Sequence, residues 1–183
     1  VDTTSVYECI ENDDLDDRID GYEDTFTTST EAEDEAWVQY TSGTTGRPTA
    51  VPYQHESIAL FAPVMDFVLD FQPEDTCLTT SSTGWGTGIW IGTFAPLMHG
   101  VTTGYYSGSF DPETALEAID EFEINVLIGI VPTAYRKIVD AARENNRRVS
   151  IEKANYVGEP IDPDLSRDIE DVLGAFPRST YGV

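Results

Sequence analysis

The nearly unbroken apolar run at residues 124–131, INVLIGIV, restricts the possible folds of this chain more than any other feature. It lacks the apolar–polar alternation of a strand with one solvated face, so it is typical of a parallel strand covered on both faces. Helix-start signals flank the run, with Asp111-Pro112 before it and Pro132 directly after it. Strands that alternate with helices predict an α/β fold with a mainly parallel sheet and flanking helices.

The same alternation extends over the rest of residues 37–183. Further strands are expected at residues 36–40, 76–80, 101–106 and 153–157. Residues 55–71 are apolar nearly all round and predict a buried helix, kinked or restarted at Pro63. The helices that start at Asp111 and Asp162 are each expected to bury one apolar stripe: Ala115, Leu116, Ile119 and Phe122 in the first, and Leu165, Ile169, Val172, Leu173 and Phe176 in the second.

Residues 1–36 differ in composition from the rest of the chain. They hold 14 of its 34 acidic residues and one basic residue, Arg18, and their apolar residues follow no clear period. We therefore predict two parts, a weakly structured acidic lead-in at residues 1–36 and the α/β domain at residues 37–183.

The net charge of −24 limits the partners of this protein. Such a surface repels nucleic acid and anionic membranes. Excess carboxylate with only two lysines is typical of a halophile's protein, where molar salt shortens the screening length to about 3 Å. The 40% share of hydrophobic residues argues against an acidic disordered chain. An acidic interaction domain without a ligand is an open alternative, and it predicts no rise in melting temperature when a small-molecule ligand is added.

The two cysteines, Cys9 and Cys77, lie far apart and have no metal-ligand spacing. We assign no metal-ligating residue. No signal peptide is recognisable, and the longest apolar stretch carries Asp66 and Asp70 and is too short to span a membrane. A reducing, cytoplasmic location is the prediction.

Residues 40–49, YTSGTTGRPT, form a loop of glycines and hydroxyl side chains after a short strand. Such a loop can direct backbone N–H and side-chain OH groups at phosphate oxygens. It differs from the Walker loop, because its glycine spacing is different and no lysine follows Gly46. On composition alone, a loop without a ligand is the simpler interpretation.

The segment TSGTTGRP resembles, residue for residue through Pro48, the phosphate loop of the adenylate-forming superfamily, which includes acyl-CoA synthetases, peptide-synthetase adenylation domains and luciferases. This resemblance implies that ATP phosphates bind Thr41, Ser42, Gly43, Thr44, Thr45, Gly46 and Arg47. The family has a lysine where this chain has Thr49, which removes a cation expected near the leaving pyrophosphate. Arg47 is a candidate substitute.

Two further segments resemble nucleotide-binding motifs of the same family. Gly158, Glu159 and Pro160 are similar to the GEP segment that lies along adenine. Ser179, Thr180, Tyr181 and Gly182 are similar to the start of the [S/T]YGxTE motif, in which Thr180 would hydrogen-bond the α-phosphate and act in catalysis. As plain sequence, both segments also fit ordinary turns. The chain begins at Val1 and ends inside this last motif, so we expect an internal piece of a longer enzyme that is inactive alone.

The acyl-binding part of the family site is represented by a third group of residues: Trp85, Gly86, Thr87, Val157 and Thr133. A tryptophan is more often a core residue, but the small residues around Trp85 favour a cleft wall. Ser82 stands where relatives usually have an aspartate. Acetate-activating relatives carry a bulky aromatic residue at the position of Gly182, so glycine there implies a longer, medium-chain or similar acid.

The resemblance implies an ATP-dependent acid–CoA ligase that uses ATP, Mg²⁺, coenzyme A and a small carboxylic acid. An enzyme that loads a carrier protein is one alternative. A nucleotide-binding protein without adenylation activity is another, because Thr49 and Ser82 depart from the family pattern.

Overall fold

The computed structural model describes residue 25 and residues 27–41, 46–106 and 108–181. The chain divides into two compact units, residues 1–31 and 32–183, and almost all described residues belong to the second. The predicted role of residues 1–36 therefore falls largely outside the described part and stays a prediction.

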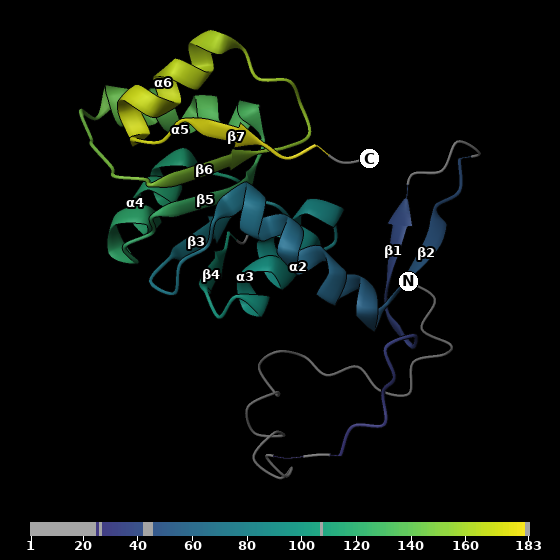
Figure 1. The fold of residues 1–183 in the computed structure, drawn as a ribbon. Helices are drawn as coiled ribbons and strands as arrows, with labels where there is room; N and C mark the ends of the chain where they lie inside the picture. The colour runs from purple at the N-terminus through teal and green to yellow at the C-terminus, as the bar shows by residue number, and fades with distance from the viewer. Residues whose placement is uncertain (1–24, 26, 42–45, 107, 182–183) are drawn as a thin grey trace. The chain divides into compact units, whose positions relative to one another are not determined.

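A five-stranded parallel sheet forms the centre of the second unit (Figure 1). Its strand order is β4 (Thr102–Tyr105), β3 (Thr76–Thr79), β5 (Val126–Ile130), β6 (Lys153–Tyr156) and β7 (Pro177–Ser179). Every neighbouring pair of these strands is parallel, so the predicted fold class is confirmed.

The helices connect these strands. They are α2 (His55–Leu69), the π-helix η2 (Thr87–Phe94), α3 (Ala95–Met98), α4 (Pro112–Glu121), α5 (Pro132–Glu144) and α6 (Pro163–Leu173). The expected caps form, because the Asp111 and Asp162 carboxylates accept backbone N–H bonds from Thr114 and Leu165 at 2.9 and 2.7 Å. No helix among the described residues is long and apolar enough to cross a membrane.

Successive side chains of β5 point to opposite faces of the sheet and enter two separate cores. Leu127 packs with residues of α4, α5 and α6, including Leu116, Tyr135 and Ile169. Val126 and Ile128 pack on the other face with Met65 and Leu69 of α2, Ile91 of η2 and Ala95 of α3. The strand is therefore covered on both faces, which is what its almost continuous apolar run predicts.

Three details of the predicted packing are wrong. Phe122 and Phe176 are 62% and 56% exposed, because α4 ends at Glu121 and α6 ends at Leu173, before each phenylalanine is reached. Helix α2 is buried on one side only, and Leu60 and Phe67 are 71% and 89% exposed. An all-round apolar sequence therefore does not distinguish a helix with two covered faces from one with a single covered face.

A separate antiparallel hairpin precedes α2. It consists of β1 (Glu35–Thr41) and β2 (Thr49–Gln54), and Thr41 pairs with Thr49 at the end where the glycine-rich loop connects them. The sequence indicates the first strand but not the second. Trp37 of β1 makes an edge contact with Trp90 of η2 at 5.5 Å between ring centroids, and stacks on Tyr53 of β2 at 5.0 Å.

Strand β5 contains one bulge, at Gly129. The register against β6 shifts between Leu127 and Ile130, and Gly129 has φ +64°, in the left-handed region. A Cβ atom here would lie 2.6 Å from Cγ2 of Thr87, so the position needs glycine for both conformation and space.

A buried ion pair joins the opposite, amino edge of the sheet. Lys153 Nζ lies 2.6 Å from Oδ2 of Asp75, whose side chain is 1% exposed. The same carboxylate accepts hydrogen bonds from the backbone N–H of Gln72 and from Nδ2 of Asn125, at 2.8 and 3.1 Å. The start of β3 is thereby fixed to the starts of β5 and β6.

Candidate functional site

Two of the predicted nucleotide-binding segments directly follow neighbouring strands, at the carboxyl edge of the sheet. Gly158 follows β6, and Thr180 and Tyr181 follow β7, the strand paired beside it. The backbone N–H of Thr180 donates to the carbonyl of Tyr156 at 3.0 Å, which extends the β6–β7 pairing into the loops. The sheet thus brings together segments that are about twenty residues apart in sequence, at the edge where α/β proteins bind ligands.

Gly158 lies beside Trp85 of the predicted acyl-binding loop. Its φ of +84° lies in the left-handed region. A Cβ atom there would lie 3.5 Å from Cη2 of Trp85 and 3.6 Å from Cγ1 of Val131. The tryptophan ring therefore lies over the backbone of the GEP corner, and Trp85 is 47% exposed rather than a core residue.

A hollow of about 710 Å³ lies between these segments, within the usual size of small-molecule pockets. It is lined by Gln39, Tyr53, Ser57, Leu60, Phe61, Trp85, Gly86, Thr87, Trp90, Ile91, Val157, Gly158, Thr180 and Tyr181. None of these lining residues is acidic or basic, although the chain carries 34 acidic residues. A carboxylate or phosphate in the hollow therefore meets no carboxylate in its wall.

Half of the lining residues were not anticipated from the sequence. Gln39, Tyr53, Ser57, Leu60, Phe61, Trp90 and Ile91 come from β1, β2, α2 and η2. Trp90 lies at the centre of the aromatic part of this wall, 5.1 Å from the ring centroids of both Tyr53 and Phe61. The sequence signal that could have found them is the density of aromatic residues in the hairpin and η2. Their convergence depends on hairpin packing that no local pattern contains.

One buried side chain holds the Thr180 hydroxyl in place. Asn155, in β6, has no exposed surface. Its Nδ2 donates to Oγ1 of Thr180 at 2.5 Å and to the carbonyl of Arg178 at 3.1 Å. Its Oδ1 accepts a hydrogen bond from the N–H of Gly129 at 3.1 Å. The bulge removes this N–H from the hydrogen bonds between β5 and β6. Sequence analysis missed Asn155 because it matches no motif.

The family model described as AMP-binding enzyme matches residues 1–183. The chain belongs to the AMP-binding enzyme family.

Curated members of the AMP-binding family include acyl-CoA synthetases similar to this chain. Acetyl-coenzyme A synthetase of Bacillus subtilis (strain 168) is 34% identical over 133 residues, which cover 71% of this chain and 23% of that protein. Human mitochondrial acyl-coenzyme A synthetase ACSM3 is 30% identical over 145 residues, covering 78% of this chain and 25% of that protein. The chain therefore spans about a quarter of the length of the curated relatives it matches.

Solved structures show the same fold. ATP-bound MatB from Rhodopseudomonas palustris superimposes with a TM-score of 0.75 at 23% identity, over 92% of this chain and 33% of that one. The inhibitor-bound N-terminal domain of FACL13 from Mycobacterium tuberculosis gives a TM-score of 0.77 at 21% identity, over 93% and 42% of the two chains. The sheet and its helices thus have the fold of that N-terminal domain.

The family's phosphate loop is only partly described here. Ser42, Gly43, Thr44 and Thr45 lie outside the described residues, as does Gly182. Thr41 ends β1, Gly46 has φ +82°, and Arg47 is exposed. The predicted contacts of this loop with ATP stay predictions, including substitution of the missing lysine by Arg47.

The predicted site residues Glu159, Pro160, Ser179 and Thr133 are described but are not among the lining residues of the hollow. Thr133 is exposed on the first turn of α5 and is not among the lining residues, so its predicted contact with the acyl group also stays a prediction. Arg136, on the next turn, pairs with Asp162 at 2.7 Å and supports the start of α6. The Asp162 carboxyl has a lowered pKa, first because it accepts the Leu165 N–H and second because Arg136 lies beside it.

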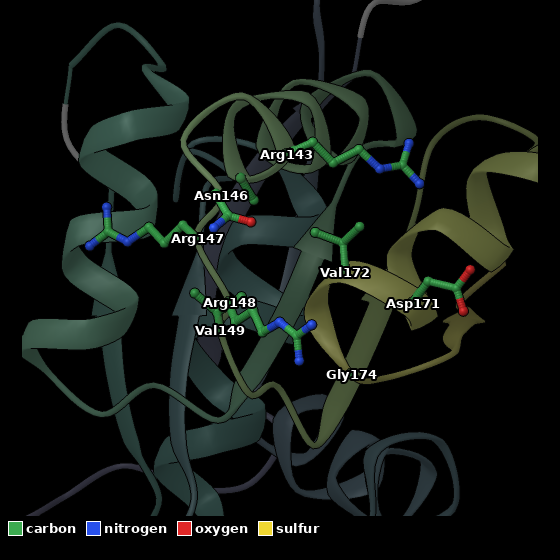
Figure 2. A pocket seen from close by; sticks show the side chains of 9 residues that line it. Arg143, Asn146, Arg147, Arg148, Val149, Asp171, Val172 and Gly174 are labelled. Atoms are coloured by element: carbon green, nitrogen blue, oxygen red, sulfur yellow. The ribbon is translucent and has the colours of Figure 1, made fainter.

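A second hollow, of about 430 Å³, lies between the carboxyl ends of α5 and α6 (Figure 2). Arg143, Arg147 and Arg148 line it together with Asp171. Arg143 pairs with Asp168, and Arg147 pairs with Asp120 at 2.7 Å. Arg143 and Arg147 are thus each paired with a carboxylate of a neighbouring helix, Asp168 of α6 and Asp120 of α4.

Proposed function

We propose that the full-length protein is an ATP-dependent acid–CoA ligase that acts on a medium-chain or similar apolar acid. The observation that carries the proposal is the hollow lined by Gly158, the Thr180–Tyr181 segment and the Trp85–Thr87 loop, which has no acidic or basic residue in its lining. Membership of the AMP-binding family and the similarity to named acyl- and acetyl-CoA synthetases support it.

The reaction takes place in two steps. A carboxylate is a poor electrophile, so one of its oxygens attacks the α-phosphorus of ATP. The bond from that phosphorus to the bridging oxygen breaks, which gives acyl-AMP and pyrophosphate. The sulfur of coenzyme A then attacks the acyl carbonyl, AMP leaves, and the thiol proton is released. The protein's part in such a reaction is to position the reactants and to stabilise developing charge.

The described residues suit separate parts of the reactants. Gly158, Thr180 and Tyr181 line the hollow, and we assign Gly158 and Tyr181 to the base and the Thr180 hydroxyl to the α-phosphate. Trp85, Thr87, Trp90 and Ile91 provide an aromatic and aliphatic wall for the acyl chain. Magnesium bound to phosphate oxygens would neutralise charge. Among the described residues, no group of three His, Cys, Asp or Glu side chains could hold a metal ion.

The decisive experiment measures exchange of labelled pyrophosphate into ATP by the full-length protein, in molar KCl, with a series of straight-chain acids. Exchange that requires an acid and peaks at medium chain length is expected. Exchange followed by thioester formation with free coenzyme A separates the ligase from an enzyme that loads a carrier protein.

Thr49 motivates a second candidate, a nucleotide-binding protein that does not adenylate. This residue stands where the family has lysine, and it lies in β2, paired with Thr41 across the base of the phosphate loop. The variant Thr49→Lys decides between the candidates. Exchange that is absent from the native protein and gained by the variant establishes the second candidate, whereas exchange by the native protein rejects it.

A further inference from the structure

The amide of Asn155 has only one orientation that satisfies its neighbours. The carbonyl of Arg178, 3.1 Å away, can only accept a hydrogen bond, and the N–H of Gly129, also 3.1 Å away, can only donate one. Nδ2 must therefore face Arg178 and Oδ1 must face Gly129. Because Asn155 is fully buried, no water can satisfy the reversed orientation.

This orientation fixes the direction of the Thr180 hydroxyl proton. The second N–H of Asn155 Nδ2 points at Oγ1 of Thr180, 2.5 Å away, so that oxygen acts as the acceptor. The hydroxyl hydrogen of Thr180 therefore cannot point along this line toward Nδ2 of Asn155. Thr180 lines the hollow and is partly exposed, so the O–H bond is free to turn toward the hollow.

From these contacts we infer that Asn155 is a positioning residue for adenylation, an inference that rests on the function proposed above. It orients Thr180 so that the hydroxyl donates to an anionic oxygen on the α-phosphate. The oxygen gains negative charge as the carboxylate adds, so a donor held in place before the reaction stabilises the transition state more than the ground state. Asn155 itself does not touch the substrate.

The bulge in β5 makes this arrangement possible. Since Gly129 leaves the ladder, its N–H is available to bind Oδ1 of Asn155, and its carbonyl accepts the hydroxyl of Ser81 at 2.7 Å. Without that anchor the amide could rotate. The positioning therefore depends on three adjacent strands: β5 supplies the Gly129 N–H, β6 carries Asn155 and β7 supplies the Arg178 carbonyl.

The test compares Asn155→Asp, Thr180→Val and the double variant in the full-length protein. Aspartate has the shape of asparagine but replaces the Nδ2 donor by an oxygen that accepts. The Thr180 hydroxyl then donates to this oxygen, and its proton points away from the hollow. Thr180→Val is expected to lower kcat for acid-dependent pyrophosphate exchange by about 10²-fold, the usual effect of one lost donor to developing charge. Asn155→Asp is expected to lower kcat at least 10-fold with little change in KM for ATP. The double variant should be no slower than Thr180→Val.

Tyr135→Phe is the matched control. Tyr135 is fully buried, and its hydroxyl donates to the backbone carbonyl of Asn155 at 3.1 Å without touching the amide side chain. This variant loses a buried hydrogen bond at the same residue, so it should melt at a lower temperature but keep kcat. Asn155→Ser, which is neutral and smaller, serves as the second variant if aspartate prevents folding, and the same loss of kcat is expected.

The outcomes separate this inference from the proposed function. A native protein without acid-dependent exchange overturns the proposed function. If the native protein shows exchange but the losses of kcat caused by the Asn155 and Thr180 substitutions multiply in the double variant, only the positioning role is overturned. A native kcat in Asn155→Ser has the same consequence. Losses that do not multiply, together with native kcat in Tyr135→Phe, support it.

Discussion

Replacing Gly129 by alanine should destabilise the protein much more than the same change at Gly100. Both glycines have left-handed backbones, with φ +64° and +68°. An added Cβ at Gly129 would lie 2.6 Å from Cγ2 of Thr87, whereas at Gly100 no atom lies within 4 Å. The two variants therefore share the conformational cost and differ in packing.

The magnitude follows from these two contributions. A non-glycine residue in the left-handed region costs about 1–2 kcal/mol. Overpacking of a well-filled site adds about 1–3 kcal/mol. We expect a loss of about 1–2 kcal/mol for Gly100→Ala and of about 2–5 kcal/mol for Gly129→Ala, measured by urea unfolding of the full-length protein at one fixed salt concentration.

A third variant identifies the source of the difference. Thr87→Ala removes the atom that would collide with the new methyl group. When combined with Gly129→Ala, it should recover most of the excess loss over Gly100→Ala. Equal losses for the two glycine variants, or no recovery in the combination, would refute the packing argument.

Three further predictions concern groups outside the hollow. Lys153→Met leaves the buried Asp75 carboxylate without its cation and should cost about 3–5 kcal/mol in urea unfolding; a loss below about 1 kcal/mol contradicts this. Because folding lowers the pKa of the Asp162 carboxyl, this group stabilises the folded protein fully above pH 3.8, its ordinary pKa. The stabilisation is lost as the pH falls through the lower pKa of the folded state. The melting temperatures of native protein and Asp162→Ala should therefore converge in acid, and a constant difference would count against this. Burial raises the pKa of the Cys77 thiol to about 12, so in a Cys9→Ser background a thiol reagent at pH 8 should react only after unfolding, whereas fast labelling of the folded protein contradicts it.

The parallel sheet could be predicted from sequence because local patterns determine it. The apolar run at residues 124–131 indicates a strand covered on both faces, and β5 has both faces covered. Asp111-Pro112 and Asp162-Pro163 mark helix starts, and both aspartates form caps. Helix ends were predicted less well, as the exposed Phe122 and Phe176 show, since an apolar residue just past a helix end continues the helical period in sequence.

The candidate site was predictable only where motifs carry it. Gly158, Thr180 and Trp85 were identified by resemblance, and all three line one hollow. Asn155 could not be found in this way, because its role arises from the bulge in β5 on one side and from the carbonyl of Arg178 in β7 on the other. The same holds for Gln39, which reaches the hollow through hairpin packing rather than through any local pattern.

The central claim is that the GEP corner and the Thr180–Tyr181 segment hold the adenine end of one ATP molecule. Photolabelling of the full-length protein with 8-azido-ATP, followed by peptide mapping with mass spectrometry, tests this most directly. The account predicts label on peptides that contain residues 158–160 or 179–182, and protection by unmodified ATP. Protectable label confined to other peptides, such as those around the arginine-lined hollow of Figure 2, would contradict it.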